Sequence, residues 1–173
     1  PLFISAGGAG AGKTFGWQTV AEENNLKRLG EKDDPSDSDW GYVMLSDPDD
    51  EKDFRKKLAE YNGTYIDDKE HPHILVFDDA DKILTSKAGA MKALMKKITD
   101  NNPENRVFVN PETGETEVFK GALLIMTNKD VAAISNANED AKAIMSRGMV
   151  NDMQFTRAES MELINKRWKT MKL

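Results

Sequence analysis

Eight residues near the start of the chain, Gly7 to Thr14, constrain its fold more than any other segment. They read Gly-Gly-Ala-Gly-Ala-Gly-Lys-Thr. A short apolar run, Leu2 to Ser5, precedes them, as is typical of a strand buried on both faces, and a segment of helical character, about Lys13 to Leu29, follows. Glycines allow backbone conformations in which several N–H groups point at one position. The sequence therefore predicts a strand, an anion-binding loop and a helix, in that order.

The spacing of this segment, G-x-x-x-x-G-K-[ST], is that of a phosphate-binding loop, in which backbone N–H groups and the helix N-terminus bind phosphates. In such a loop the lysine, here Lys13, reaches the β- and γ-phosphates of a nucleotide, and the hydroxyl, here of Thr14, ligates magnesium. The alternative is a flexible glycine loop with an incidental lysine, but the flanking strand and helix favour the phosphate loop. The predicted nucleotide-binding residues are Gly7, Gly8, Ala9, Gly10, Ala11, Gly12, Lys13, Thr14 and Phe15.

Further apolar runs alternate with helical patterns along the chain. The segment Met91 to Ile98 has apolar residues at i, i+3, i+4 and i+7, the pattern of an amphipathic helix. Asp47 and Pro48 predict the start of another helix, with Asp47 as its cap. Strands that alternate with helices favour an α/β fold, with a parallel sheet and helices on both faces. The remaining predicted strands of this sheet are Trp40 to Leu45, His73 to Phe77, Ala122 to Thr127 and Met149 to Phe155.

Two carboxylates follow the predicted strand that ends at Phe77. A nucleotide site needs one carboxylate to hold magnesium, directly or through water, and a second to orient and activate the attacking water. Asp78 suits the first role and Asp79 the second. Alternatively, Asp78 caps the next element and Asp79 is solvated. The phosphate loop upstream favours the catalytic interpretation.

Asn128 and Arg147 complete the predicted site. The carboxyl ends of parallel strands line the ligand crevice, so Asn128 is expected to face the attacking water or the γ-phosphate, unless it is a turn residue. Arg147 follows a helical segment and is expected to reach a neighbouring subunit's nucleotide and stabilise transition-state charge. Its alternative is an ordinary surface charge at a helix end. The predicted catalytic residues are Lys13, Asp79, Asn128 and Arg147, and the predicted magnesium ligands are Thr14 and Asp78.

Composition excludes several other classes of protein. The 173 residues suit a single domain, and 24 basic against 30 acidic residues give a net charge of −6, which argues against a generally basic nucleic-acid coat protein. Without cysteine, disulfide scaffolds, thiolate zinc sites and iron–sulfur clusters are excluded, and two histidines are too few for a histidine-rich metal site. The apolar runs are too short to span a bilayer, and the sequence shows no basic leader. We therefore expect a cytoplasmic location with no membrane partner.

These features, in this order, resemble the AAA+ ATPases from Leu2 to about Phe155. The resemblance implies a three-layer P-loop NTPase with a parallel five-stranded sheet in the order 5-1-4-3-2 and a β-hairpin insertion before sensor 1. It also implies a homo-oligomeric ring, often a hexamer, with ATP shared between subunits. Residues 1–155 would form the α/β ATPase core and residues 156–173 the start of a truncated helical lid. The matching motifs are Walker A at Gly7 to Thr14, Walker B at Ile74 to Asp79, sensor 1 at Asn128 and the arginine finger at Arg147.

The expected function is Mg²⁺-dependent ATP binding and hydrolysis by an oligomeric AAA+ motor in DNA replication or processing. The segments Glu117 to Asn128 and Ser146-Arg147 are similar to phage- and plasmid-borne members of the family, which implies the cytoplasm of a bacterial host. A hairpin is predicted within Arg106 to Lys120, where replication initiators and superfamily three helicases contact DNA. Single-stranded DNA is therefore a candidate partner, although Glu112 and Glu115 at the tip would repel phosphates. The alternative is a hairpin that only packs against a neighbouring subunit.

Two other functions stay open. One is a protein-remodelling ATPase, but such members carry an aromatic pore loop after the second strand, and the corresponding Ser46 to Glu51 has no aromatic residue. The other is a nucleotide-gated assembly module with little turnover. Most related ATPases have glutamate where this chain has Asp79, and the shorter side chain keeps this third possibility open.

Overall fold

The computed structural model describes residues 2–8, 12–29, 41–62, 64–66, 69–71, 73–153, 158–159 and 161–162. Its strands are β1 (Leu2–Ala6), β2 (Lys27–Leu29), β3 (Gly41–Ser46), β4 (Thr64–Ile66), β5 (Lys69–His71), β6 (Ile74–Asp78), β7 (Val107–Val109), β8 (Thr116–Val118), β9 (Ala122–Met126) and β10 (Met149–Asp152). Its helices are α1 (Lys13–Glu23), α2 (Glu51–Glu60), α3 (Lys82–Thr85), α4 (Gly89–Ile98), α5 (Val131–Ala137) and α6 (Glu139–Met145), with a short 3₁₀ helix η2 (Pro103–Asn105).

Six of the strands form one sheet in the order β10-β1-β9-β6-β3-β2. Every pairing in this sheet is parallel. The prediction of five strands in the order 5-1-4-3-2 is therefore corrected, because the sheet has six strands and β2 extends the order at one edge. The additional strand is β2, which pairs with β3 at the sheet edge, in a segment for which the sequence predicts helix. The segments predicted as strands are the neighbours β10, β1, β9, β6 and β3.

Helix α1 ends at Glu23, well before the end of the predicted helical segment. Asn24 and Asn25 turn the chain, and Asn25 has a φ of 54°, in the left-handed region that asparagine tolerates better than most residues. The N–H of Leu26 then donates to the carbonyl of Ala21 over 2.8 Å and closes the helix end. The chain leaves this turn as β2. The asparagine pair is the sequence signal that predicts such a stop.

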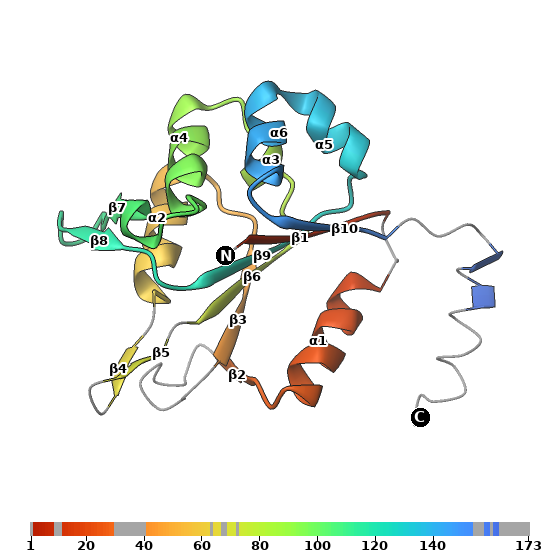
Figure 1. Cartoon of the computed structure of the whole chain (residues 1–173), viewed down its shortest axis with the longest axis horizontal. Helices are drawn as coiled ribbons and strands as arrows, with labels where there is room; N and C mark the ends of the chain where they lie inside the picture. The colour runs from red at the N-terminus through yellow and green to blue at the C-terminus, as the bar shows by residue number, and fades with distance from the viewer. Residues whose placement is uncertain are drawn as a thin grey trace.

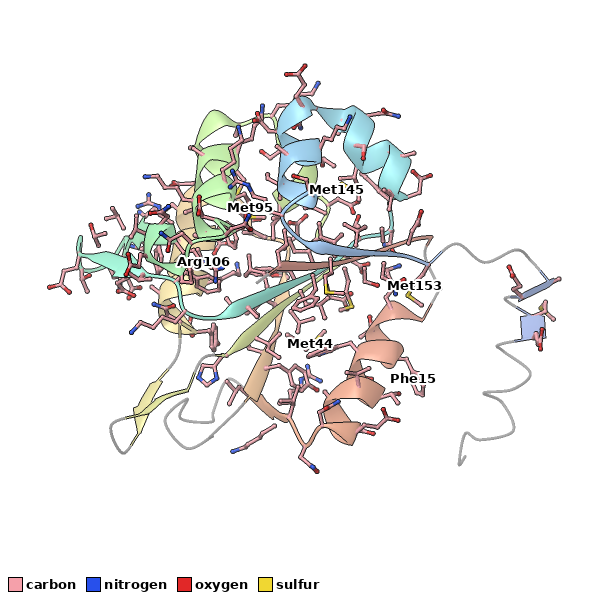
Figure 2. All side chains as sticks on the ribbon, in the orientation of Figure 1. Phe15, Met44, Met95, Arg106, Met145 and Met153 are labelled. Atoms are coloured by element: carbon pink, nitrogen blue, oxygen red, sulfur yellow. The ribbon has the colours of Figure 1, made fainter. Side chains whose placement is uncertain are left out.

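Helices cover both faces of the sheet, but unequally (Figure 1). Helices α2 to α6 share the main hydrophobic core with one face. Among the described helices, α1 alone covers the other face, where Trp17 packs edge-on against Tyr42 in a smaller cluster. Figure 2 shows the same division, with Met95 and Met145 on the side of α4 and α6 and Met44 on the side of α1. The fold therefore has three layers, as an α/β domain with a parallel sheet requires.

The antiparallel pair β7–β8 is the hairpin predicted within Arg106 to Lys120. It docks on the C-terminal end of α2. The side chain of Asn62 donates to the Val118 carbonyl and accepts from the Lys120 N–H, both over 2.9 Å. Arg55 of α2 donates to the Val109 carbonyl over 3.1 Å. These contacts hold the hairpin against its own chain.

Some predictions fall on residues that the structure does not describe. These include residues 154–155 of the last predicted strand and most of residues 156–173, so the predicted lid and its boundary lie outside the described residues. A second hairpin, β4–β5, has no counterpart in the prediction. Within the described ranges, no helix is both long enough and apolar enough to span a bilayer.

Candidate functional site

The predicted site residues of β1, β6 and β9 meet at the carboxyl edge of the sheet. The three strands are neighbours in parallel register, so the segments that follow them emerge side by side. A cavity of about 430 Å³ lies there. Its lining residues are Gly12, Lys13, Thr14, Phe15, Asp78, Asp79 and Asn128.

Lys13 is almost fully buried, with 8% of its surface exposed. Its Nζ donates to the carbonyls of Gly7 and Gly8 over 3.0 and 3.1 Å, and to Oδ1 of Asn128 over 3.1 Å. Burial lowers the pKa of Lys13 from the ordinary lysine value, while the charges of Asp79, Asp78 and Asp81 partly offset this effect. The ammonium group is thus held at the floor of the cavity by three acceptors and has acidic neighbours. A phosphate would be a stronger partner for it than these carbonyls.

Thr14 and Asp78 contact each other beside Lys13. The Thr14 hydroxyl donates to Oδ2 of Asp78 over 3.1 Å and lies 3.3 Å from Oδ1. Neighbouring ligands of octahedral Mg²⁺ lie about 2.9 Å apart, so these oxygens are spaced to share one ion. In the described part of the chain, no group of three or more histidine, cysteine, aspartate or glutamate side chains is arranged to hold a metal. A pair of protein ligands is typical of magnesium that is bound together with substrate phosphates.

Asp79 has an unusual backbone conformation, with a φ of 50°. This left-handed region costs a residue other than glycine about 1 kcal/mol or more, and such conformations concentrate at functional sites. The conformation is held by two hydrogen bonds. The Asp79 N–H donates to Oδ1 of Asp78 over 3.0 Å, and Nδ2 of Asn128 donates to Oδ1 of Asp79 over 2.8 Å. The exposed carboxylate is thus fixed at the rim of the cavity.

The loop glycines are required where the backbone turns. Gly7 has a φ of 137°, and a Cβ atom there would lie 2.4 Å from the carbonyl oxygen of Met153. Gly12 has a φ of 79° and precedes the first turn of α1. Gly8 is exposed next to the Lys13 ammonium, and Phe15 lines the cavity with about half of its surface exposed. The predicted nucleotide-binding residues Ala9, Gly10 and Ala11 lie outside the described residues.

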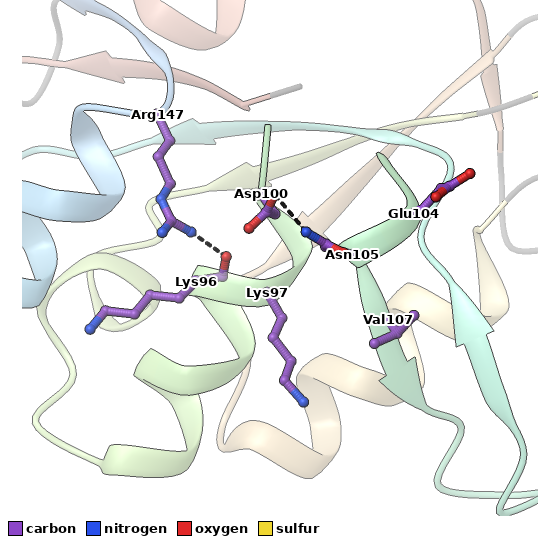
Figure 3. Close-up of a pocket in the computed structure, with 7 residues that line it drawn as sticks. All are labelled: Lys96, Lys97, Asp100, Glu104, Asn105, Val107 and Arg147. Atoms are coloured by element: carbon purple, nitrogen blue, oxygen red, sulfur yellow. Dashed lines mark hydrogen bonds between the residues drawn. The ribbon is translucent and has the colours of Figure 1, made fainter. Parts of the chain in front are cut away.

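Arg147 does not lie at this cavity. It lies two residues before β10, at the amino edge of the sheet, and a parallel strand of this length separates the two edges by roughly 13 Å. Its Nη1 donates to the Lys96 carbonyl at the C-terminal end of α4 (Figure 3). There it lines a second cavity of about 440 Å³ with Lys96, Lys97, Asp100, Glu104, Asn105 and Val107. Within this chain, the structure therefore brings together all the described predicted site residues except Arg147.

Sequence analysis assigns no role to two residues beside the site, Thr127 and Asp81. Thr127 directly follows β9 and is fully buried, and its hydroxyl donates to Oδ1 of Asp81. The available signal was a threonine at the end of an otherwise apolar strand, directly before Asn128. Asp47 also differs from its prediction, because Asp50 caps α2 and accepts from the Asp53 N–H over 2.8 Å.

Comparisons with known proteins find a distant likeness to a solved structure. No family model and no curated protein matches the chain. Among solved structures, the chain is similar to the Orc1 protein of Aeropyrum pernix in complex with DNA, with 14% sequence identity and a TM-score of 0.45. The alignment covers 96% of this chain and 43% of that one, so the chain spans less than half the length of that relative. A likeness this distant assigns neither a family nor a function. The α/β fold and its parallel sheet by themselves fit a P-loop NTPase.

Proposed function

We propose that the protein binds Mg·ATP and hydrolyses it. One observation carries the proposal: the glycine loop, the acids at the end of β6 and the amide after β9 contact one another around a single cavity. The contact between Lys13 and Asn128 joins residues that are 115 positions apart. An incidental lysine in a flexible glycine loop would not be fixed by a side chain from a distant strand.

Each residue has a defined role in this proposal. The Lys13 ammonium exchanges its carbonyl partners for the β- and γ-phosphates. Thr14 and Asp78 hold magnesium, which neutralises phosphate charge when bound. Asp79 orients the attacking water and accepts its proton. The amide of Asn128 already contacts both Lys13 and Asp79, so it lies between the phosphate and water positions.

The proposed reaction also uses Arg147, but from a second subunit. The described lining of the cavity has one cation, Lys13, against two carboxylates, Asp78 and Asp79. Charge that develops on the transferred phosphoryl group therefore favours a further cation from outside. Arg147 lies at the opposite edge of the sheet, in the lining of the second cavity, so in this proposal it serves the nucleotide of a neighbour and not its own. These positions support an AAA+-type homo-oligomer with shared sites, a ring in the simplest case.

For the partner, we propose DNA, in replication or processing of the phage type. The support is the hairpin β7–β8, which precedes the strand of Asn128 as in the DNA-contacting members that the sequence resembles. Its exposed tip carries Glu112 and Glu115, and Lys56 of α2 pairs with Glu112 over 3.4 Å. Any phosphate contact therefore falls to the base of the hairpin, at Arg106 and Lys120, and not to its tip.

The deciding experiment is the steady-state ATPase rate of the purified protein, with and without single-stranded DNA at several salt concentrations. We expect Mg²⁺-dependent turnover that Lys13→Ala abolishes together with ATP binding. Lys52→Ala, which removes an exposed lysine of α2, is the matched control and should behave as wild type. DNA should raise the rate, and salt should weaken this effect because phosphate contacts are electrostatic.

Other results lead to the other functions. A rate that ignores DNA favours a protein-remodelling ATPase. Tight ATP binding without turnover favours a nucleotide-gated assembly module. Wild-type ATP affinity in Lys13→Ala would contradict the phosphate-loop assignment itself.

A further inference from the structure

Thr127 forms hydrogen bonds through both its backbone N–H and its side-chain hydroxyl. Its N–H donates to the Ser5 carbonyl of β1 over 3.0 Å, which continues the sheet pairing beyond β9. Its hydroxyl donates to Oδ1 of Asp81, and the hydroxyl oxygen of Thr127 also accepts from the Lys129 N–H over 3.1 Å. The side chain is fully buried, so no solvent replaces these partners. Thr127 therefore fixes the turn that contains the next residue, Asn128.

The Asp81 carboxylate can accept from Thr127 because a different aspartate, Asp47, caps helix α3. Asp81 occupies the N-cap position of α3, where an aspartate side chain ordinarily accepts from the N–H groups of its own helix. It makes no such bond. Instead Asp47, from the end of β3, accepts from the Lys82 N–H over 2.8 Å. Asp47 thus caps α3 in place of Asp81, and the Asp81 side chain contacts Thr127 at the end of β9 instead.

The contacts of Thr127 continue into the phosphate loop. Lys129, whose N–H is held by Thr127, accepts the Gly7 N–H at its own carbonyl over 3.1 Å. Asn128 lies between these two tethers. Its Oδ1 is 3.1 Å from the Lys13 Nζ. A change at Thr127 would therefore alter the direction of the Asn128 amide before it altered any residue that contacts phosphate.

From this chain of contacts we infer that Thr127 and Asp81 are positioning residues, which hold Asn128 in register with the phosphate loop during hydrolysis. The inference rests on the proposed function. Neither side chain lines the cavity, so both act through Asn128. Their loss should slow turnover and leave nucleotide affinity nearly unchanged.

The test compares two substitutions of the same residue. Thr127→Val keeps the shape of the buried side chain and removes its hydroxyl, whereas Thr127→Ser keeps the hydroxyl. We expect Thr127→Val to lower kcat about 10-fold or more, because small misplacements of catalytic groups have effects of this size. Its ATP affinity should stay within about 3-fold of wild type, since a kcat effect without a binding effect marks a group needed only in the transition state. Thr127→Ser should restore most of the rate.

A matched control is available elsewhere in the chain. Thr99 is also buried, at 5% exposure, and its hydroxyl donates only to the Met95 carbonyl of its own helix. Thr99→Val makes the same chemical change and should keep the wild-type rate. Asp81→Ala should also lower kcat, and the double variant should be no slower than Thr127→Val alone, because that change already removes the contact between Thr127 and Asp81.

Amide hydrogen exchange tests the same inference without turnover. In Thr127→Val, the N–H groups of Lys129 and Gly7 should lose protection, because the first loses its acceptor and the second is bonded to the carbonyl of the released residue. Thr127→Ser should keep both protected.

Unchanged protection in Thr127→Val, or an unchanged kcat, would overturn the inference while the proposed hydrolysis stands. If the wild type binds ATP without turnover, the proposed function fails, and exchange at Gly7 and Lys129 alone decides whether Thr127 holds the turn.

Discussion

Two cavities at opposite edges of the sheet have nearly the same volume, about 430 and 440 Å³, but very different construction. The lining of the first comes from three separate segments, at the carboxyl ends of β1, β6 and β9. All but one of the residues that line the second lie between Lys96 and Val107, and the exception is Arg147. Cavity volume therefore does not distinguish a functional site from a surface hollow here. The two cavities differ instead in whether segments distant in the sequence converge on one point.

Backbone conformation also distinguishes the two edges of the sheet. Gly7, Gly12 and Asp79 all have positive φ values and all lie at the carboxyl edge. In the described part of the chain, no residue that lines the second cavity has one. Strained backbone persists only where surrounding contacts enforce it, and it is concentrated where side chains must be aimed.

The largest effect is expected from the residue that would link the two edges in an oligomer, Arg147. Arg147→Ala should lower kcat of the oligomer by about 10³-fold, the typical effect of an arginine supplied to a phosphoryl-transfer site, with little change in ATP affinity. The measurement is turnover at saturating ATP, with thermal unfolding to show that loss of the Lys96 contact leaves the fold intact.

Mixed oligomers sharpen this prediction. Subunits with Lys13→Ala keep Arg147, and subunits with Arg147→Ala keep an intact phosphate loop. Mixing two inactive variants should therefore restore part of the activity if the arginine of one subunit serves the site of another. A mixture that stays inactive, or an Arg147→Ala oligomer at the wild-type rate, would leave the second cavity without a catalytic role.

A smaller effect is expected at the carboxyl edge from Asp79→Asn. Loss of a general base costs about 10²-fold or more in kcat, while ATP binding through Lys13 and Thr14 should persist. Asparagine also tolerates a positive φ, so the backbone at this position should keep its conformation. Single-turnover hydrolysis and equilibrium ATP binding, measured on the same preparation, separate the two steps. Hydrolysis at the wild-type rate would show that the base is another group.

The smallest effect is expected from Asp140→Asn, because Asp140 of α6 only pairs with two lysines of α4, Lys92 and Lys96. Lys96 donates to Asp140, and together with Lys92, at 3.4 Å, it holds the pKa of this carboxylate below its ordinary value of 3.8. A lowered pKa in the folded state stabilises the protein above pH 3.8 and loses this contribution as the pH falls through the lowered value. Exposed ion pairs contribute little, so the variant should unfold only slightly earlier at pH 7. Its difference from wild type should vanish in acid, and a difference that persists there would point to packing instead of charge.

Sequence reasoning reached much of this fold because the informative signals were local. A glycine loop between an apolar strand and a helix, and two acids after another apolar strand, follow from a few neighbouring residues each. The parallel sheet then follows from the alternation of elements. The amphipathic helix predicted at Met91 to Ile98 forms as α4, within one turn of its expected bounds.

The features that sequence reasoning missed depend on partners distant in the chain. Asp47 precedes a helix and reads as its cap, but Asp50 takes that place and Asp47 caps α3 instead. The pairing of Thr127 with Asp81 requires β6 and β9 to be neighbours first. Strand β2 has no strong pattern of its own and forms because β3 offers an open edge.

Helix α1 has a consequence for observing the site. It begins at Lys13 in the phosphate loop, and one turn later Trp17 packs edge-on against Tyr42 of β3, with ring centroids 5.4 Å apart. Because no other described helix shares that face, any displacement of α1 changes the surroundings of this indole. The chain thus carries an intrinsic optical reporter, and its tryptophan emission should change when the loop is filled, without any label.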